Sequence, residues 1–186
     1  MEDKEIIKKC LSGDKYAFSE LVNRYKKLVF STAYRMLGNY EEAEDASQEV
    51  FIRIYNSLNR YNSLYKFSTW SMRITTNYCL DMLRKRKGDV YSLESQYDLQ
   101  DDSLSPEEHY IKQENQNTVQ KAIDSLPDKY KVLIILFHFR GLSYSEIMDV
   151  TGESLTIIKN RLYRGRQMLK EIFENKESEN ICNAAK

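Results

Sequence analysis

The sequence predicts an all-α protein of two small helical domains joined by an acidic linker, the second domain containing a helix-turn-helix. Only 6 Gly and 2 Pro occur among 186 residues, too few for the many turns of a β-sandwich or barrel. Apolar residues recur at the spacing of amphipathic helices along most of the chain, and no segment shows a clear strand pattern. The formal net charge is zero, but the charges are segregated along the chain.

Four helices are predicted in residues 1–87, the first domain. The first helix ends at Gly13 and carries Ile6, Ile7, Cys10 and Leu11. Asp14 is expected to cap a second helix that ends at Gly38. A third begins near Glu41 and buries a face made of Ala43, Ala46, Val50, Ile54 and Leu58. Ser68 or Thr69 is expected to cap the fourth, which carries Trp70, Ile74, Tyr78 and Met82 to the basic run Arg84–Lys87.

The second domain is placed at residues 116–186. Ser105-Pro106-Glu107-Glu108 has the composition of a helix start, and this helix is expected to run to about Leu126. Pro127 restarts the chain in a helix that ends at Gly141 and buries Val132, Leu133, Ile135, Leu136 and Phe139. Ser143 begins a short helix with Ile147, Met148 and Val150. After a turn at Thr151–Glu153, Ser154 is expected to cap a long helix with Ile157, Ile158, Leu162, Met168 and Leu169.

Residues 88–115 form the predicted linker, which continues into the first helix of the second domain. This segment holds one basic and eight acidic side chains, whereas residues 1–87 hold 16 basic and 11 acidic ones. Like charges repel one another, and its first part has no strong apolar period, so we expect an extended connection. A solvated loop inside a single domain is the alternative, although connections of this length are uncommon within compact domains.

A short helix, a glycine-containing turn and a longer helix match the DNA-binding helix-turn-helix arrangement. Between Ser154 and Lys170 the chain has five basic side chains and no acidic one. The helix face opposite Ile158 and Leu162 presents Lys159, Asn160, Tyr163 and Arg164, with Arg166 nearby. Lys and Arg neutralise phosphates, and Arg also pairs with guanine edges. The sequence therefore predicts DNA contact, with a merely solvated basic face as the alternative.

The first domain carries two further sets of side chains. An acidic helical surface contains Glu41, Glu42, Glu44, Asp45, Gln48 and Glu49. DNA repels such a surface, so its expected partner is a basic protein, unless it is an ordinary solvated face. Aromatic rings crowd the next segment among cations and amides: Tyr61, Tyr65, Phe67 and Trp70 with Arg60, Asn62, Ser63, Lys66 and Asn77. Such groups suit unstacked bases, although Phe67 is better explained as core. The run Arg84–Lys87 suits phosphates.

These motifs together resemble those of a known protein family. Ala43–Phe51 resembles the core-polymerase-binding motif of bacterial sigma factors, and Phe67–Arg84 resembles their promoter-melting helix. Leu126-Pro127, Gly141–Ile147 and Lys159–Arg166 resemble their promoter-reading domain. Two domains on a short linker are similar to the extracytoplasmic-function (ECF) group, and the resemblance covers nearly the whole chain.

The resemblance implies three binding surfaces on bacterial core RNA polymerase and promoter DNA. Core polymerase would be bound by Asp45, Gln48 and Glu49. Single-stranded DNA of the −10 element would be bound by Arg60, Tyr61, Asn62, Tyr65, Lys66, Trp70, Arg73, Asn77, Arg84 and Lys85. The −35 element would be read by Lys159, Asn160, Tyr163, Arg164 and Arg166. Departures from the family pattern at Met148, Thr156-Ile157-Ile158 and Gly165 bear on the −35 preference.

The chain is expected not to be an enzyme and to need no cofactor and no metal. His109 and His138 lie far apart with no cysteine near them, and His138 sits in an apolar run typical of core. Three scattered cysteines and the lack of an apolar stretch of about 18 residues favour a cytoplasmic protein with no membrane insertion. The resemblance adds an anti-sigma factor as partner, and we expect a monomer when free. A plain transcriptional regulator and a metal-dependent nuclease at Glu41–Glu49 are the alternatives.

Overall fold

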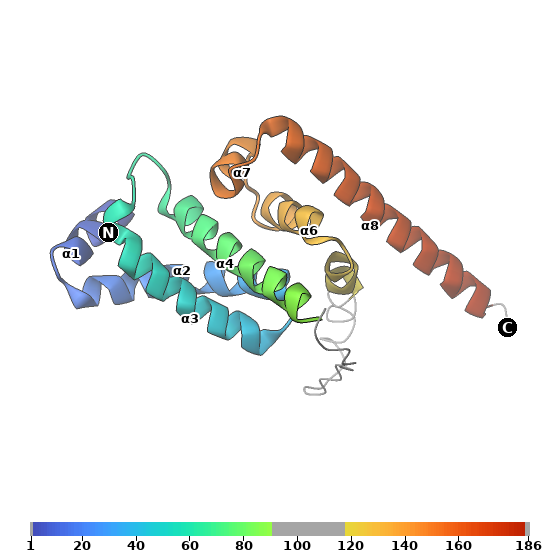
Figure 1. Ribbon diagram of the computed structural model, residues 1–186, viewed down its shortest axis with the longest axis horizontal. Helices are drawn as coiled ribbons and strands as arrows, with labels where there is room; N and C mark the ends of the chain where they lie inside the picture. Colours follow the sequence, from blue (N-terminus) through green and yellow to red (C-terminus); the bar gives the residue numbers. More distant parts are fainter. Residues whose placement is uncertain (1, 91–117, 185–186) are drawn as a thin grey trace.

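The computed structural model describes residues 2–90 and 118–184, and within these ranges the chain is helical with no strand, as predicted. The first half contains α1 (Asp3–Leu11), α2 (Lys15–Leu37), α3 (Tyr40–Ser57), a 3₁₀ turn η1 (Leu58–Arg60) and α4 (Phe67–Val90). α2 packs against α1, α3 and α4, and so forms the centre of this half (Figure 1).

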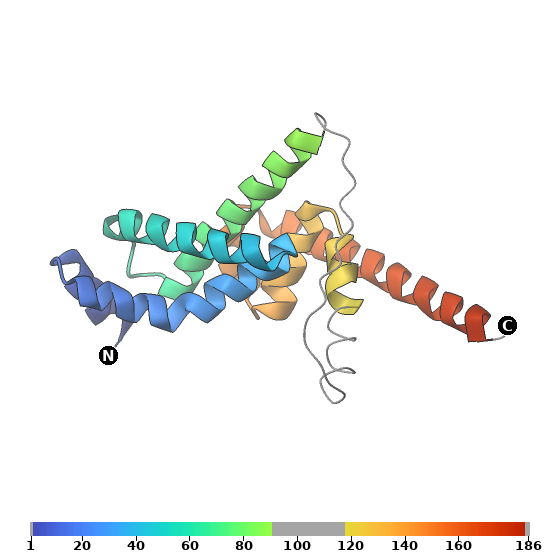
Figure 2. The ribbon, with the colours of Figure 1, turned by 90° about the horizontal axis from the view of Figure 1, so that it is seen from below.

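The second half begins with a helix at residues 118–124. It continues with α6 (Asp128–Ile134), a π-helical turn η2 (Ile135–Phe139), α7 (Tyr144–Thr151) and α8 (Leu155–Ala184). α8 packs along α6 and α7, and its C-terminal part extends away from the rest of the molecule in both views (Figures 1 and 2). The helix start predicted at Ser105 and most of the predicted linker lie outside the described residues.

Local sequence signals explain most helix ends. The Asp14 side chain accepts hydrogen bonds from the backbone of Tyr16 and Ala17, at 2.9 and 3.3 Å, and thereby caps α2 as predicted. Gly38 ends α2 in the left-handed region, with φ of 76°, where a side chain would be strained. Asn39 caps α3, a role that the sequence interpretation did not assign.

The helix-turn-helix forms where it was predicted. Ser143 caps α7 in a capping box with Glu146, and Gly152 ends this helix in the left-handed region with φ of 72°. In a capping box the two side chains satisfy each other's exposed backbone donors at the first turn. α8 begins directly after Ser154, whose carbonyl accepts from the backbone of Ile158 at 3.1 Å.

Two expectations about single elements were wrong. α4 begins at Phe67, two or three residues earlier than a cap at Ser68 or Thr69 would allow, because the backbone of Trp70 already donates to the Lys66 carbonyl at 3.1 Å. His138 is exposed rather than packed in the core. The π-helical turn causes this: Arg140 donates to the carbonyl five residues back, at Ile135, which shifts the side chains from the regular helical register.

Two apolar side chains of the helix-turn-helix also differ from expectation. Met148 and Ile157 were assigned to the apolar faces of their helices, but they are 38% and 42% exposed. Their helix neighbours Ile147 and Ile158 are fully buried instead. The short α7 and the first turn of α8 have only one narrow buried face each. Ile147 and Ile158 occupy these faces, so Met148 and Ile157 point to solvent.

The buried apolar side chains form two clusters. One belongs to the first half and contains Ile6, Ile7, Ala17, Leu21, Val29, Val50, Ile54, Leu58 and Phe67. The other is continuous across both halves: it includes Met36, Met72 and Leu83 of the first half as well as Leu133, Ile147 and Leu162 of the second. α4 and α7 are the elements that meet most extensively between the halves. The two halves thus pack together rather than standing apart on a tether.

Candidate nucleic-acid interface

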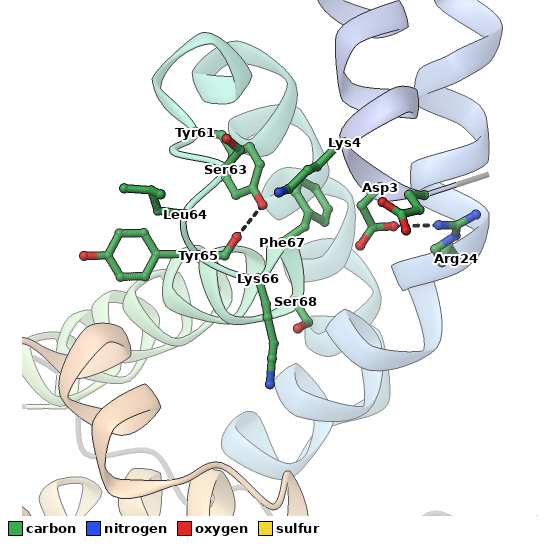
Figure 3. Close-up of a pocket in the computed structure, with 11 residues that line it drawn as sticks. Asp3, Lys4, Arg24, Tyr61, Ser63, Leu64, Tyr65, Lys66, Phe67 and Ser68 are labelled. Carbon is green, nitrogen blue, oxygen red and sulfur yellow. Dashed lines mark hydrogen bonds and ion pairs between the residues drawn. The ribbon is translucent and has the colours of Figure 1, made fainter.

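The loop between η1 and α4 is held in shape by its own hydrogen bonds. The Tyr61 hydroxyl donates to the carbonyl of Tyr65 at 2.6 Å (Figure 3). The backbone of Leu64 donates to the Asn62 side chain at 3.0 Å. These two contacts close the loop and turn the Leu64 and Tyr65 side chains outward, where they are 87% and 50% exposed. An exposed ring on a rigid loop is available for stacking against a base.

The other aromatic side chains form the base of this loop. Tyr61 packs against Phe67 and Trp70 with ring centroids 5.5 and 5.3 Å apart. Phe67 is only 2% exposed, which confirms its assignment to the core. Burial raises the pKa of the Tyr61 hydroxyl, and the negative charge of Asp3 raises it further. Tyr61 therefore supports the loop from beneath, while Tyr65 is the ring that faces solvent.

A pocket of about 570 Å³ opens beside the loop. Its walls come from two places in the chain: the loop contributes residues 61 and 63–68, and the N-terminal helices contribute Glu2, Asp3, Lys4 and Arg24 (Figure 3). The sequence interpretation found the first wall and missed the second. No local signal marks the second wall, because α1 and α2 reach this loop only through folding.

Asp3 anchors that second wall. Its carboxylate accepts from Arg24 Nη1 at 2.6 Å and from the Tyr25 hydroxyl. Burial raises the pKa of Tyr25, and the hydrogen bond to Asp3 adds to this. Tyr25 also packs edge-on against Phe67, with centroids 4.9 Å apart. Asp3 thus fastens α1 to the same aromatic cluster that supports the loop.

The remaining predicted residues of this surface lie along α4. Trp70, Arg73, Asn77 and Arg84 share one face, because they are spaced by three, four and seven residues. A second, smaller pocket of about 120 Å³ lies at the start of this face and is lined by Tyr65, Thr69, Trp70, Arg73 and Asp149. Asn77 and Arg60 are exposed but line neither pocket. The predicted set is therefore brought together only in part.

The basic run at the end of α4 divides into two roles. Lys85 is exposed, and Arg84 pairs with Asp81 at 3.2 Å on the surface. Arg86 forms an ion pair with Glu42 and donates to the Leu37 carbonyl at 3.3 Å. Arg86 therefore fastens the end of α4 to α2 and α3. Its ion pair also neutralises Glu42, so this carboxylate no longer adds free negative charge to the acidic surface of α3.

The acidic helix borders a groove of about 370 Å³ between α2 and α3. Its lining is partly apolar and partly charged: Val22, Lys26, Lys27, Phe30, Glu44, Ser47, Gln48 and Phe51. Of the three residues predicted to bind polymerase, Gln48 lies in this groove. Asp45 is exposed just outside it, and Glu49 pairs with Arg53 at 2.9 Å. Lys26, Lys27 and the two Phe side chains were not predicted as part of this surface.

The predicted recognition helix presents its polar face as expected. Ile158, Leu162 and Gly165 are buried, whereas Lys159, Asn160, Tyr163 and Arg164 are exposed on the other side. Arg164 also forms a hydrogen bond with Tyr130, which lowers the pKa of that hydroxyl. Arg166 lies apart from this group, beside an apolar groove that also contains His138, and its Nε donates to the Leu162 carbonyl at 3.2 Å.

The close packing around Gly165 explains why glycine occupies this position, one of the departures from the family pattern. A Cβ atom at this position would lie 3.1 Å from Cγ1 of Ile134 and 3.4 Å from Cβ of Tyr130. The absence of a side chain therefore lets α8 approach α6 closely, which compensates for the weak helix propensity of glycine.

Within residues 2–90 and 118–184, no three His, Cys, Asp or Glu side chains are grouped to hold a metal ion. No helix there has the length and apolar character needed to cross a membrane.

Each half of the chain matches the description of a known protein family. The family description "Sigma-70 region 2" matches residues 21–88, and "Sigma-70, region 4" matches residues 116–169. The first match covers the loop, α4 and the acidic helix, and the second covers the helix-turn-helix. Together, in this order, they define the protein as a sigma-factor-type transcription protein.

Similar proteins of known family identify the group of sigma factors to which the chain belongs. The chain is 38% identical over 177 residues to "ECF RNA polymerase sigma factor SigW" of Bacillus subtilis, covering 90% of this chain and 95% of the relative. It is 36% identical to "ECF RNA polymerase sigma factor SigE" of Mycolicibacterium smegmatis, covering 93% of this chain and 69% of that one. The chain belongs to the ECF RNA polymerase sigma factor family, whose members direct promoter-specific initiation of transcription.

Solved structures show the same fold. CnrH, solved in complex with the cytosolic domain of CnrY, superposes with a TM-score of 0.69 at 21% identity, covering 93% of this chain and 97% of CnrH. The sigma factor RpoE from Bartonella quintana, solved with the anti-sigma factor NepR, gives a TM-score of 0.70 at 21% identity, covering 84% and 96%. At this identity the likeness concerns the fold alone.

Proposed function

We propose that this sigma factor divides promoter recognition among the three surfaces described above, and that it acts as a non-catalytic cytoplasmic subunit of RNA polymerase. The groove between α2 and α3, with Asp45, Gln48 and Glu49, binds core polymerase. The loop pocket and the exposed face of α4 bind the unpaired −10 strand. The exposed face of α8 reads the −35 element.

The observation that carries this proposal is the pocket beside the loop. Its volume, about 570 Å³, is in the range of small-molecule sites and accommodates one nucleobase. Tyr65 offers a half-exposed ring at its edge, and Lys66 supplies a positive charge. Stacking on such a ring contributes about 1–3 kcal/mol per base, comparable with the few kcal/mol that extracting a base costs. One pocket therefore roughly offsets the opening of one base pair.

The −35 surface rests on the exposed residues of α8. Lys159 and Arg164 are cationic, and Asn160 offers an amide that pairs with adenine edges. Arg166 points toward the apolar groove and contributes less than the other four. Each half reads its element weakly, and the tether raises the effective concentration of the second contact once the first has formed.

Protein partners complete the proposal. Core polymerase would bind the groove between α2 and α3 through both its charges and its phenylalanine side chains. An anti-sigma factor is proposed as the regulating partner, since solved structures of the same fold contain such partners. The free chain is expected to be a monomer.

In-vitro transcription tests the proposal. Purified core polymerase of Bacillus subtilis, the source of a relative 38% identical, is combined with the chain on a promoter library, and start sites are sequenced. The expected result is a new set of starts with shared −10 and −35 elements. No start-site choice, or no association with core polymerase, would refute the assignment.

Matched variants separate the three surfaces. Tyr65→Ala is expected to lower initiation about 5- to 100-fold, and a template already unpaired at the −10 element should restore most of it. Tyr16→Ala, which also removes an exposed tyrosine, is the control. Asp45→Lys should weaken core binding, whereas Glu171→Lys, on the exposed part of α8, should not.

Asn160→Ala should lower activity on the selected −35 sequence and leave activity on a scrambled −35 sequence unchanged. Lys170→Ala, further along the same helix, serves as its control. Equal losses on both templates would mean that Asn160 does not read bases.

A further inference from the structure

Ile157 is an exposed apolar side chain in the first turn of α8. It is 42% exposed, whereas the neighbouring Ile158 is fully buried, and it belongs to neither of the two apolar clusters. β-branched side chains also have a lower helix propensity than most unbranched ones. Neither core packing nor helix formation therefore accounts for an isoleucine at this position, which is part of the departure from the family pattern at Thr156-Ile157-Ile158.

The position of Ile157 around the helix axis places it on the proposed DNA-reading face. Successive residues of an α-helix are about 100° apart around its axis, so Ile157 lies about 20° from Arg164 and about 60° from Asn160. Asn160 and Arg164 are both exposed. Ile157 thus continues their face toward the N-terminal end of α8, and this end of a recognition helix is the part that contacts base edges in the major groove.

The surroundings of Ile157 suit an apolar contact with DNA. Arg161, one turn further along α8, forms an ion pair with Glu153, in the turn before the helix. This pair neutralises the cation next to Ile157. The first turn of α8 therefore offers a base an apolar surface here rather than a positive charge.

Thymine is the base that presents an apolar group in the major groove. It carries a C5-methyl group there beside its O4 acceptor, whereas the other three bases present hydrogen-bond donors and acceptors. Apolar side chains recognise thymine by contact with this methyl group. A polar group of another base would lose water against isoleucine and gain no hydrogen-bond partner, which costs free energy.

We propose that Ile157 is a specificity-determining residue of the −35 surface and reads the C5-methyl group of one thymine. This inference rests on the proposed role of α8 in reading the −35 element, and it adds an apolar contact to the polar ones of Asn160 and Arg164. The chain accordingly prefers thymine at the base pair that faces the first turn of α8.

Deoxyuridine substitution tests this contact, because uracil differs from thymine only in the missing methyl group. The promoter selected by in-vitro transcription is synthesised with each −35 thymine, on either strand, replaced singly by deoxyuridine. Initiation by the reconstituted polymerase should fall about 3- to 5-fold at one thymine, the effect of one buried methyl group. With a C·G pair at the same position, 5-methylcytosine should support more initiation than cytosine does.

Ile157→Ala should remove the dependence on the methyl group. Initiation on the thymine promoter should fall about 3- to 10-fold, and deoxyuridine should then cause no further loss, because both changes remove the same contact. Leu155→Ala is the matched control. Leu155 is 39% exposed in the same turn, but it lies about 180° from Arg164 around the helix axis, so this variant should keep the wild-type response to deoxyuridine. Circular dichroism of both variants checks that the helices are intact.

Two results would overturn the inference. One is a wild-type chain for which no −35 thymine can be told from deoxyuridine. The other is an Ile157→Ala variant that loses as much initiation on the deoxyuridine promoter as the wild-type chain loses, because the two changes would then act on different contacts.

Failure of the proposed function is visible separately. If the chain conferred no start-site choice on polymerase, the proposed function would be wrong and this inference with it. If start-site choice depended on Asn160 while Ile157→Ala kept the wild-type response to deoxyuridine, the −35 assignment would stand and the role of Ile157 alone would be wrong.

Discussion

The ion pair between Lys131 of α6 and Asp124 gives a quantitative test of the packing around helix 118–124 in the second half. Lys131 Nζ lies 2.5 Å from Asp124 Oδ1, and the lysine side chain is only 7% exposed, whereas that of Asp124 is 34% exposed. Asp124 also accepts from Gln120, whose amide bonds to the Arg35 carbonyl of α2 at 3.2 Å. The carboxylate therefore compensates a buried cation and helps to hold helix 118–124 against α2.

Asp124→Ala should lower the free energy of unfolding substantially. Removing one partner of a fully buried pair costs about 3–5 kcal/mol, because the other charge is left without compensation. Asp124 is one third exposed, so water can enter and partly solvate the lysine. The expected loss is therefore smaller, about 2–3 kcal/mol.

Lys131→Met distinguishes the buried charge from the lost contact. Methionine is unbranched and fills the same space without a charge, and Asp124 is exposed enough to remain hydrated. This variant should change the free energy of unfolding by less than about 1 kcal/mol, and in combination with Asp124→Ala it should recover most of the loss. Gln120→Ala reports the contribution of the amide alone.

Urea unfolding of the full chain measures these values, followed by both circular dichroism and Trp70 fluorescence so that separate transitions of the halves are seen. The reasoning would be refuted if Asp124→Ala and Lys131→Met had equal effects, because the buried lysine would then carry no penalty. It would also fail if the double variant were as unstable as Asp124→Ala.

Three further predictions follow from local geometry. Gly152→Ala should lower the free energy of unfolding by about 1–2 kcal/mol because of the left-handed backbone, with φ of 72°, and Gly152→Asn should lower it less in the same urea titration. The pKa of Glu146 is lowered from 4.5 in the folded chain. This carboxylate therefore stabilises the fold above pH 4.5, and the stabilisation is lost as the pH falls through the lower pKa of the folded state. Glu146→Gln should make the free energy of unfolding depend less on pH in this acid range. Burial raises the pKa of the Cys79 thiol to about 12, so iodoacetamide at pH 8 should modify Cys79 only in urea, as judged by mass spectrometry of its peptide; equal modification of the folded chain would contradict its burial.

Helix positions were predictable because their causes are local. Asp14, Gly38 and Ser143 act on backbone groups within four residues of themselves, so a cap or a left-handed end can be found without knowledge of the tertiary structure. The buried face of α3, with Ala43, Ala46, Val50 and Ile54, follows from the same short period. The start of α4 was misplaced because Lys66, which has no capping side chain, precedes its first turn. The π-helical turn at Ile135–Phe139 was missed because no residue type specifies it.

The candidate surfaces were predictable only in part. Runs of like residues, such as the acidic helix or the basic face around Lys159, identify a kind of partner from composition. Assigning a role to each member needs the partner side chains: Arg86 is fastened to Glu42, and Glu49 pairs with Arg53. The roles in DNA and polymerase binding stay predictions for the experiments above.

The order of helices, their caps and the segregation of charge were determined by the sequence itself, because each depends on neighbours along the chain. Tertiary structure alone decided that Asp3 and Arg24 complete a pocket begun at Tyr61, and that Glu146 meets Lys66 eighty residues away. Such contacts depend on how apolar faces pack against each other, and packing joins surfaces whose partners are not marked by any spacing in the sequence.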